Sequence, residues 1–117
     1  MKCDWELVRQ ILKAMEAMEG GPLQPGDVLG GDEATVSYHL RIMGEAGLIQ
    51  VKCVGTGARL HCMGVSLTWA GHEFLDAIAK PDLWNRIKGV VREKGLDLSF
   101  DVVKAAAKAV IETALKG

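Results

Sequence analysis

The chain has 117 residues, of which 49% are hydrophobic, 25% charged and 5% aromatic. This composition is typical of a single folded domain and excludes a disordered tail or a collagen-like chain. The formal net charge of −1 excludes a strongly basic coat for nonspecific nucleic-acid binding, but it leaves room for a local basic patch.

The sequence gives no sign of export or membrane insertion. No stretch approaches the roughly 20 apolar residues of a membrane span, and the opening MKCDWELVRQ has no apolar signal-peptide core. The odd number of cysteines, without a CxxC spacing, is not a disulfide framework (Cys3, Cys53 and Cys62). We therefore expect a cytoplasmic protein that makes no membrane contact.

The first expected element is an amphipathic helix from Asp4 to about Met18, with Asp4 as its N-cap. Its apolar positions follow the helical spacing i, i+3, i+4 and i+7 (Val8, Ile11, Leu12 and Met15). The glycine- and proline-rich stretch that follows leaves room for at most a short helical turn around Gln24–Leu29.

The second clear helix is expected from Asp32 to Ala46, with Gly47 as a left-handed C-cap. Its buried face should carry Val36, Leu40 and Met43. The hydrophobic period then changes from 3.6 to 2, which predicts a β-hairpin over residues 49–67 with its turn at 55–58. A glycine inside the second strand, Gly64, suggests a bulge.

Three further helices are expected, over residues 68–79, 82–94 and 100–116. Thr68 and Ser99 are the predicted N-caps of the first and third of these helices, and Trp69 should belong to the apolar stripe of the first. The last helix carries its own stripe (Val103, Ala107, Val110, Ile111 and Ala114). This stripe either packs within the chain or forms a homodimer.

The predicted fold is therefore mainly α with one β-hairpin. A helical pair followed by a hairpin is the order of a winged helix-turn-helix, here extended by C-terminal helices. We expect one domain over residues 1–117, with a winged-helix core at 1–79 and a helical extension at 80–117.

Two stretches resemble winged-helix regulators of the arsenic-repressor and multiple-antibiotic-resistance type. Residues 34–49 (ATVSYHLRIMGEAGLI) resemble their recognition helix, and residues 67–75 (LTWAGHEFL) resemble the run after their wing. The resemblance implies a DNA-binding transcriptional regulator that acts on double-stranded DNA.

A closer resemblance covers most of residues 1–90. The blocks MKCDWELVRQIL, YHLRIMGEAGLI and LTWAGHEFLDAI, the last followed by LWNRIK, are similar to a small family of bacterial and prophage-associated proteins with no assigned activity. This resemblance implies a fold and a bacterial or phage context. Where family members usually carry a basic residue at the third position, this chain has Cys3.

The candidate DNA-binding residues lie on the predicted recognition helix and wing. On the helix they are Thr35, Ser37, Tyr38 and Arg41, whose hydroxyl and guanidinium groups could bond phosphates or base edges. On the wing they are Lys52 and Arg59, which could reach the DNA backbone or the minor groove.

Charge supports an alternative function. Residues 1–49 contain four basic and eight acidic side chains, and Asp32 and Glu33 stand where a recognition helix normally meets DNA. The winged helix could therefore be a protein–protein interaction module, for example one that contacts a host protein. The five basic and two acidic residues of 80–95 form either a solvated face or a contact with a second subunit or DNA.

Catalytic, cofactor and metal sites are not expected. The sequence has no Gly-x-Ser-x-Gly elbow or complete dinucleotide-binding loop. Strand alternation separates His61 from Cys62, so a metal site shared by these two residues is not expected. His39 is expected to make a satisfied hydrogen bond at the edge of the core. We therefore expect a binding protein and not an enzyme.

Overall fold

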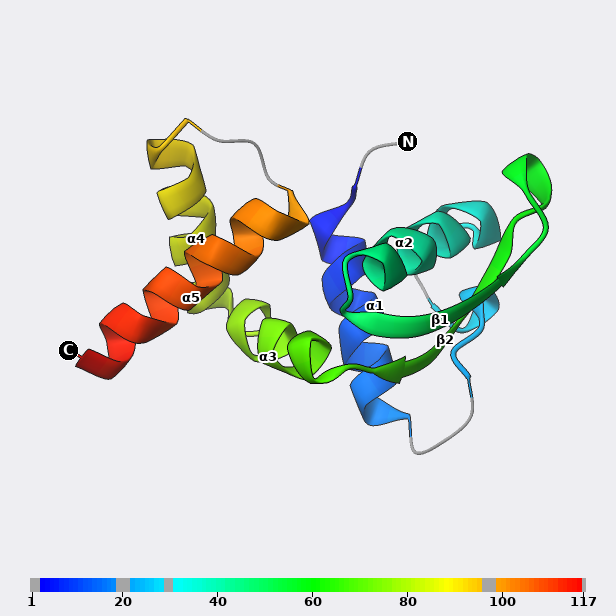
Figure 1. Ribbon diagram of the computed structural model, residues 1–117, viewed down its shortest axis with the longest axis horizontal. Coiled ribbons are helices and arrows are strands. Elements are labelled where there is room, and N and C mark those ends of the chain that lie inside the picture. Colours follow the sequence, from blue (N-terminus) through cyan, green and yellow to red (C-terminus); the bar gives the residue numbers. More distant parts are fainter. Residues whose placement is uncertain (1–2, 19–21, 29–30, 96–98, 117) are drawn as a thin grey trace. The chain divides into compact units, whose positions relative to one another are not determined.

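The computed structural model describes residues 3–18, 22–28, 31–95 and 99–116, and it describes their side chains except at positions 58, 111 and 113–116. The helices are α1 (Trp5–Ala17), η1 (Pro25–Asp27), α2 (Glu33–Glu45), η2 (Gly57–Arg59), α3 (Trp69–Ile78), α4 (Pro81–Glu93) and α5 (Phe100–Lys116) (Figure 1). The strands are β1 (Ile49–Val54) and β2 (His61–Leu67). The prediction of a mainly α chain with one hairpin is confirmed.

The chain divides into two compact units, Met1–His72 and Glu73–Gly117, called below the N-terminal and C-terminal units. The division falls inside α3. The organisation as one domain, with a boundary at residue 79, stays a prediction.

Helix starts follow the predicted caps. The Asp4 carboxylate accepts the backbone N–H groups of Glu6 and Leu7 at 3.0 and 3.3 Å, and the Asp32 carboxylate accepts that of Thr35 at 2.7 Å. The Ser99 hydroxyl accepts the Val102 N–H at 3.2 Å. These side chains satisfy backbone donors that the first turn of a helix leaves unpaired.

The second helical element is shorter than a typical helix of a helix-turn-helix. The turn expected at Gln24–Leu29 is a 3₁₀ helix of three residues, Pro25–Asp27, and Leu29 lies outside the described residues. The Asp27 carboxylate accepts the Gln24 N–H at 2.9 Å and closes the turn. Just before it, Leu23 and Gly64 exchange two backbone hydrogen bonds of 2.8 and 3.0 Å, so Leu23 lies beside β2.

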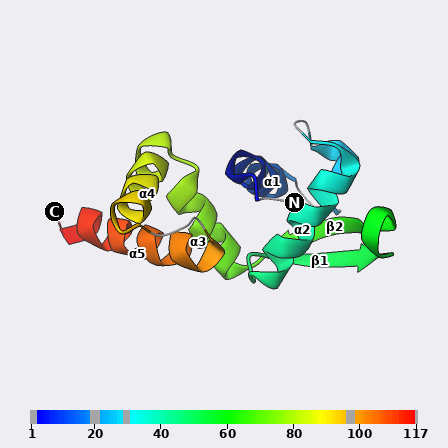
Figure 2. The ribbon, with the colours of Figure 1, turned by 90° about the horizontal axis from the view of Figure 1, so that it is seen from above.

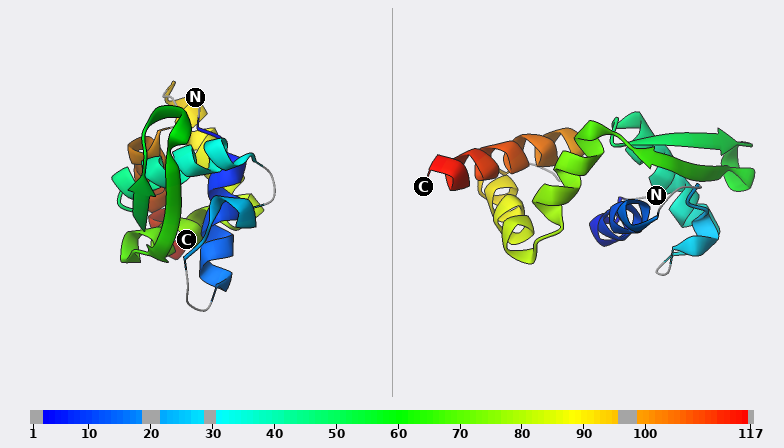
Figure 3. Two further views of the ribbon diagram at one scale, coloured as in Figure 1. Left: turned by 90° about the vertical axis from the view of Figure 1, so that its right-hand side faces the viewer. Right: turned by 90° about the horizontal axis from the view of Figure 1, so that it is seen from below.

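The hairpin pairs β1 with β2 in antiparallel register, with Cys53 directly opposite Cys62. The register shifts between Gln50 and Val51, which leaves Val65 as an extra residue next to Gly64, where a bulge was expected. Two views show the closed end of the hairpin on the side where α2 begins (Figures 1 and 3).

The N-terminal unit buries apolar side chains of α1, α2 and the strands around one core. Fully buried members include Ile11, Leu12, Leu40, Met43 and Leu48. Gly64 lets β2 approach closely, because a Cβ there would stand 2.8 Å from the Met15 sulfur and 3.3 Å from a Leu40 methyl.

The start of α3 is held on the loop that follows α2. The Thr68 hydroxyl lies 2.6 and 2.9 Å from the carbonyl oxygens of Gly47 and Leu48, and it accepts the Gly71 N–H at 3.0 Å. Thr68 is therefore the cap that the sequence predicts. Trp69 was expected in the apolar stripe but is 79% exposed, because the first turn of α3 faces Leu48 through Gly71.

The C-terminal unit is built mainly from α4 packed on α5 (Figure 2). On these two helices the buried side chains are Trp84, Ile87 and Val91 of α4, and Val103, Ala106, Ala107 and Val110 of α5. The part of α3 that belongs to this unit adds Phe74, Leu75, Ala77 and Ile78. The predicted stripe of the last helix is thus confirmed as far as Val110, whereas Ile111 and Ala114 fall outside the described side chains.

Candidate functional site

Helix α2 has a buried side and an outward side. Val36, Ser37, His39, Leu40 and Met43 are buried. The outward stripe is defined here as Ala34, Tyr38, Arg41 and Glu45, which follow one another at i, i+4, i+7 and i+11. Ala34, Arg41 and Glu45 are exposed and Tyr38 is half-buried, so another molecule can contact α2 along this stripe.

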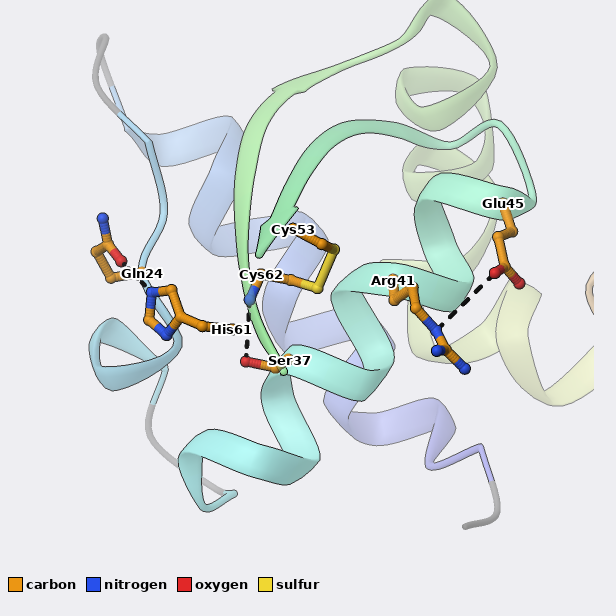
Figure 4. The surroundings of a disulfide bond; sticks show 7 residues. All are labelled: Gln24, Ser37, Arg41, Glu45, Cys53, His61 and Cys62. Carbon is orange, nitrogen blue, oxygen red and sulfur yellow. Dashed lines mark hydrogen bonds and ion pairs between the residues drawn. A yellow bond between two sulfur atoms is a disulfide. The ribbon is translucent and has the colours of Figure 1, made fainter. Parts of the chain in front are cut away.

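Ser37 corrects the sequence prediction. It was expected to face DNA, but it is only 1% exposed, and its hydroxyl accepts the backbone N–H of Cys62 at 3.2 Å. The reason is helical geometry: Ser37 lies next to Val36 and one turn before Leu40, both in the core. Its hydroxyl therefore joins α2 to β2 (Figure 4).

His39 forms a second tie, this time between α2 and α1. Its Nε2 accepts the Asp4 N–H at 2.8 Å, and its Nδ1 lies 2.8 Å from the Thr35 carbonyl oxygen. A carbonyl can only accept, so Nδ1 carries the proton and the ring is the neutral Nδ1–H tautomer. The expectation that His39 is a satisfied histidine of the core is confirmed.

Arg41 has two weak neighbours on the outward stripe. Its guanidinium lies 5.9 Å from the centre of the Tyr38 ring, and its Nε lies 3.9 Å from a Glu45 carboxylate oxygen. Exposed ion pairs of this kind stabilise a protein by at most about 1 kcal/mol. Arg41 can therefore turn toward an external anion at little cost.

The first turn of α2 is acidic. Asp32 and Glu33 are both exposed, and Thr35 is half-buried beside them. The hydrogen bond from the Thr35 N–H lowers the pKa of the Asp32 carboxyl below its usual 3.8. Asp32 therefore remains an anion at neutral pH, as the positive end of a helix dipole favours.

The hairpin presents the two predicted wing cations, Lys52 and Arg59, and both are exposed. It also contains a disulfide between Cys53 and Cys62 (Figure 4). The prediction that the cysteines form no disulfide framework is therefore wrong for this pair. The pairing depends on strand register, which places the two residues directly opposite each other.

His61 takes part in a polar contact between β2 and Gln24. Its Nε2 lies 3.1 Å from the Gln24 amide oxygen, and the Gln24 amide nitrogen lies 2.9 Å from the Met63 sulfur. Within the described parts of the chain, no three His, Cys, Asp or Glu side chains are placed to hold a metal ion.

A groove of about 300 Å³ lies between the end of α1 and the second half of β2, and the sequence did not indicate it. Its lining residues are Met15, Glu16, Met18, Leu23, Gly64, Val65, Ser66, Leu67 and His72. These residues come from four separate segments, so no local pattern could have brought them together.

Comparisons with known proteins give the family of the chain. The model of the family described as "Hypothetical protein (DUF2513)" matches residues 2–97. A Haemophilus influenzae (strain Rd) protein, named "Uncharacterized protein", is 38% identical over 117 residues, which cover 98% of this chain and 99% of that relative. The chain therefore belongs to the DUF2513 family.

These matches supply a family but no activity. No solved structure matches the chain. Among the helices that the structure describes, none combines the length and apolar character needed to cross a membrane.

Proposed function

We propose that the chain is a winged-helix DNA-binding regulator of bacterial or phage origin. The observation that carries this proposal is the outward stripe of α2 beside a hairpin with two exposed cations. In this interpretation α2 is the recognition helix and the hairpin is the wing.

The order of elements supports the winged-helix assignment. Helix α1, the Leu23 bridge, the η1 turn, α2 and the hairpin follow one another in the order of that fold, with the second helix reduced to one 3₁₀ turn. In this interpretation Leu23, which bridges to Gly64, would correspond to the short strand beside the wing.

Charge determines how such a helix would approach DNA. The carboxylates of Asp32 and Glu33 repel phosphates, so the middle of α2, at Tyr38 and Arg41, is the favourable contact point. Three phosphate contacts, from Arg41, Lys52 and Arg59, would give a salt slope of roughly −2.7 for each bound subunit, since each contact contributes about −0.9. The expected affinity is modest and depends on base contacts.

The test measures binding to a DNA library and to selected sites as a function of salt. Arg41→Ala, Lys52→Ala and Arg59→Ala should each weaken binding and reduce the magnitude of the slope by about 0.9 for each bound subunit. Lys13→Ala, an exposed cation on α1 that belongs to neither the proposed contact surface nor α5, is the control and should leave the slope unchanged. If all four variants keep the wild-type salt slope, Arg41, Lys52 and Arg59 do not contact phosphates.

A second candidate is a protein–protein interaction module without catalytic activity, with a host protein as the possible partner. The exposed Asp32 and Glu33, and the Glu45 carboxylate beside Arg41, favour it because a basic protein surface would complement them. The double variant Asp32→Asn plus Glu33→Gln distinguishes the two candidate functions. Neutralising these carboxylates should strengthen DNA binding, whereas it should weaken binding to a basic protein partner.

Two further properties belong to this proposal. A regulator of this type would act in the cytoplasm. It would bind two-fold DNA sites as a homodimer formed through the C-terminal helix, α5. Analytical ultracentrifugation with and without bound DNA tests the dimer, and a monomer in both states would contradict it.

A further inference from the structure

The disulfide joins two residues of unequal accessibility. Cys53 and Cys62 are directly opposite each other in the hairpin, only nine positions apart in the chain. Cys53 is exposed, whereas Cys62 is fully buried. A dissolved thiol or disulfide can therefore reach the pair only through Cys53, and thiol–disulfide exchange depends on such access.

The two halves of the pair also differ in how firmly they are held. The backbone N–H of Cys62 bonds the buried Ser37 hydroxyl of α2. Cys53 is followed by the exposed residues Val54 and Gly55, which lead into the turn of the hairpin. When the disulfide opens, Cys62 keeps its bond to α2, whereas Cys53 keeps only its strand pairing.

The third cysteine, Cys3, should react far more slowly in thiol–disulfide exchange. Cys3 is half-buried, and burial together with the nearby Asp4 carboxylate raises the pKa of its thiol to about 11. Since the thiolate is the nucleophile, Cys3 is almost entirely unreactive at neutral pH.

We propose that Cys53 and Cys62 form a reversible dithiol–disulfide site that exchanges with low-molecular-weight thiols and disulfides of the glutathione class. In the oxidising direction the Cys53 thiolate attacks oxidised glutathione, which forms a mixed disulfide and releases one glutathione. The Cys62 thiol then loses its proton and attacks the Cys53 sulfur, which releases the second glutathione. Two protein thiols are oxidised, and one glutathione disulfide is reduced to two thiols.

The first experiment counts thiols in the full-length protein. The protein is equilibrated in glutathione buffers of varied ratio, quenched with acid, alkylated under denaturing conditions and analysed by mass spectrometry. The number of alkylated thiols should change from three to one across the series, and from two to none in the matched control Cys3→Ala. A count that stays constant from fully reduced to fully oxidised glutathione would overturn the proposal.

The second experiment identifies the sulfur that reacts first. In the Cys3→Ala background, Cys62→Ala leaves only Cys53, and Cys53→Ala leaves only Cys62. The variant that retains Cys53 should form the glutathione adduct at least about tenfold faster, because Cys53 is the exposed residue of the pair and Cys62 is fully buried. Equal rates would overturn the assignment of Cys53 as the entry point.

A third measurement uses the wild-type protein, so its result does not depend on whether the variants fold. Peptide mapping of protein quenched during reduction by glutathione locates the first mixed disulfide without any substitution. Glutathione attached to Cys53 supports the proposal, and glutathione attached to Cys62 contradicts it.

The effect of this site on DNA rests on the proposed function. The oxidised protein should bind DNA at least about threefold more tightly than the reduced protein, because a fixed wing loses less conformational entropy on binding. If the number of thiols changes reversibly but neither state binds DNA, the redox site is supported and the proposed DNA-binding function is contradicted. If the oxidised and reduced proteins bind DNA equally tightly, only the link between the disulfide and DNA affinity is contradicted.

Discussion

The two units of the chain are stabilised by different kinds of contact. In the N-terminal unit, side-chain hydrogen bonds join elements that are 20 to 35 residues apart, through Ser37, His39 and Thr68. In the C-terminal unit, α4 and α5 meet through apolar side chains such as Ile87, Val91 and Val103. A hydrogen bond specifies one partner and one geometry, whereas apolar packing tolerates substitutions that conserve volume.

The units also differ in charge. The N-terminal unit has six basic and eight acidic residues, whereas the C-terminal unit has eight basic and seven acidic ones. The candidate contact surface therefore belongs to the more acidic unit. For this reason its few exposed cations, Arg41, Lys52 and Arg59, should have effects that can be measured one at a time.

The largest difference between the units should appear in the change of stability when a helical glycine of each unit is replaced by alanine. A Cβ on Gly71 would overlap the Leu48 carbonyl oxygen, whereas a Cβ on Gly89 of α4 meets no atom within 4 Å. Gly71→Ala should lower the free energy of unfolding by about 3 kcal/mol, and Gly89→Ala should raise it by roughly 0.5 to 1 kcal/mol. Urea unfolding measures both, and shifts of the same sign would contradict this contrast.

His39→Phe should have the next largest effect. The phenyl ring fills most of the space but leaves the Asp4 N–H without its acceptor and the Thr35 carbonyl without its imidazole donor. The Thr35 carbonyl keeps its backbone hydrogen bond within the helix, so the main cost is the unpaired Asp4 N–H. One such group costs about 1 to 3 kcal/mol, and a loss of about 2 kcal/mol in the free energy of unfolding is expected. The exposed His72 is the control, and His72→Phe should change stability by less than about 0.5 kcal/mol.

Ser37→Ala should separate stability from DNA contact. Loss of the hydroxyl leaves the Cys62 N–H unpaired and should lower the free energy of unfolding by about 1 kcal/mol. The salt slope of DNA binding should not change, because the side chain is buried. If the salt slope of DNA binding changes and the free energy of unfolding does not, Ser37 contacts DNA and this prediction is wrong.

The smallest effect concerns pH. The folded state lowers the pKa of Asp32, so the unfolded chain binds its proton more readily. The stabilisation is complete above the unfolded value near 3.8 and is lost as the pH falls through the lower folded-state value. Asp32→Asn keeps a capping oxygen but cannot titrate, so it should flatten the acid limb of the stability profile. Glu33→Gln serves as the control, and an identical flattening there would contradict the assignment to Asp32.

Much of the fold could be predicted because it depends on local signals. The caps Asp4, Asp32, Thr68 and Ser99 precede the helices that they start. Gly47 adopts the expected left-handed conformation with φ of +80° after α2. Periodicity identified the core face of α2 because Val36, Leu40 and Met43 recur at helical spacing.

The site was less predictable because its details depend on distant partners. A serine beside a buried valine can point either way, and the partner of Ser37 is 25 residues away on β2. The Cys53–Cys62 pair depends on a register that turn length and bulge position set together. Of the six predicted contact residues, Ser37 is buried, Thr35 and Tyr38 are half-buried, and Arg41, Lys52 and Arg59 are exposed.

The pairing of Leu23 with Gly64 has a consequence for self-association. An unpaired strand edge offers a row of N–H and C=O groups to any other extended chain, and such edges are sites of aggregation. At Gly64 both of these groups already bond Leu23, so a strand from a second molecule cannot dock there. A two-residue contact thus protects the middle of β2 from intermolecular sheet growth.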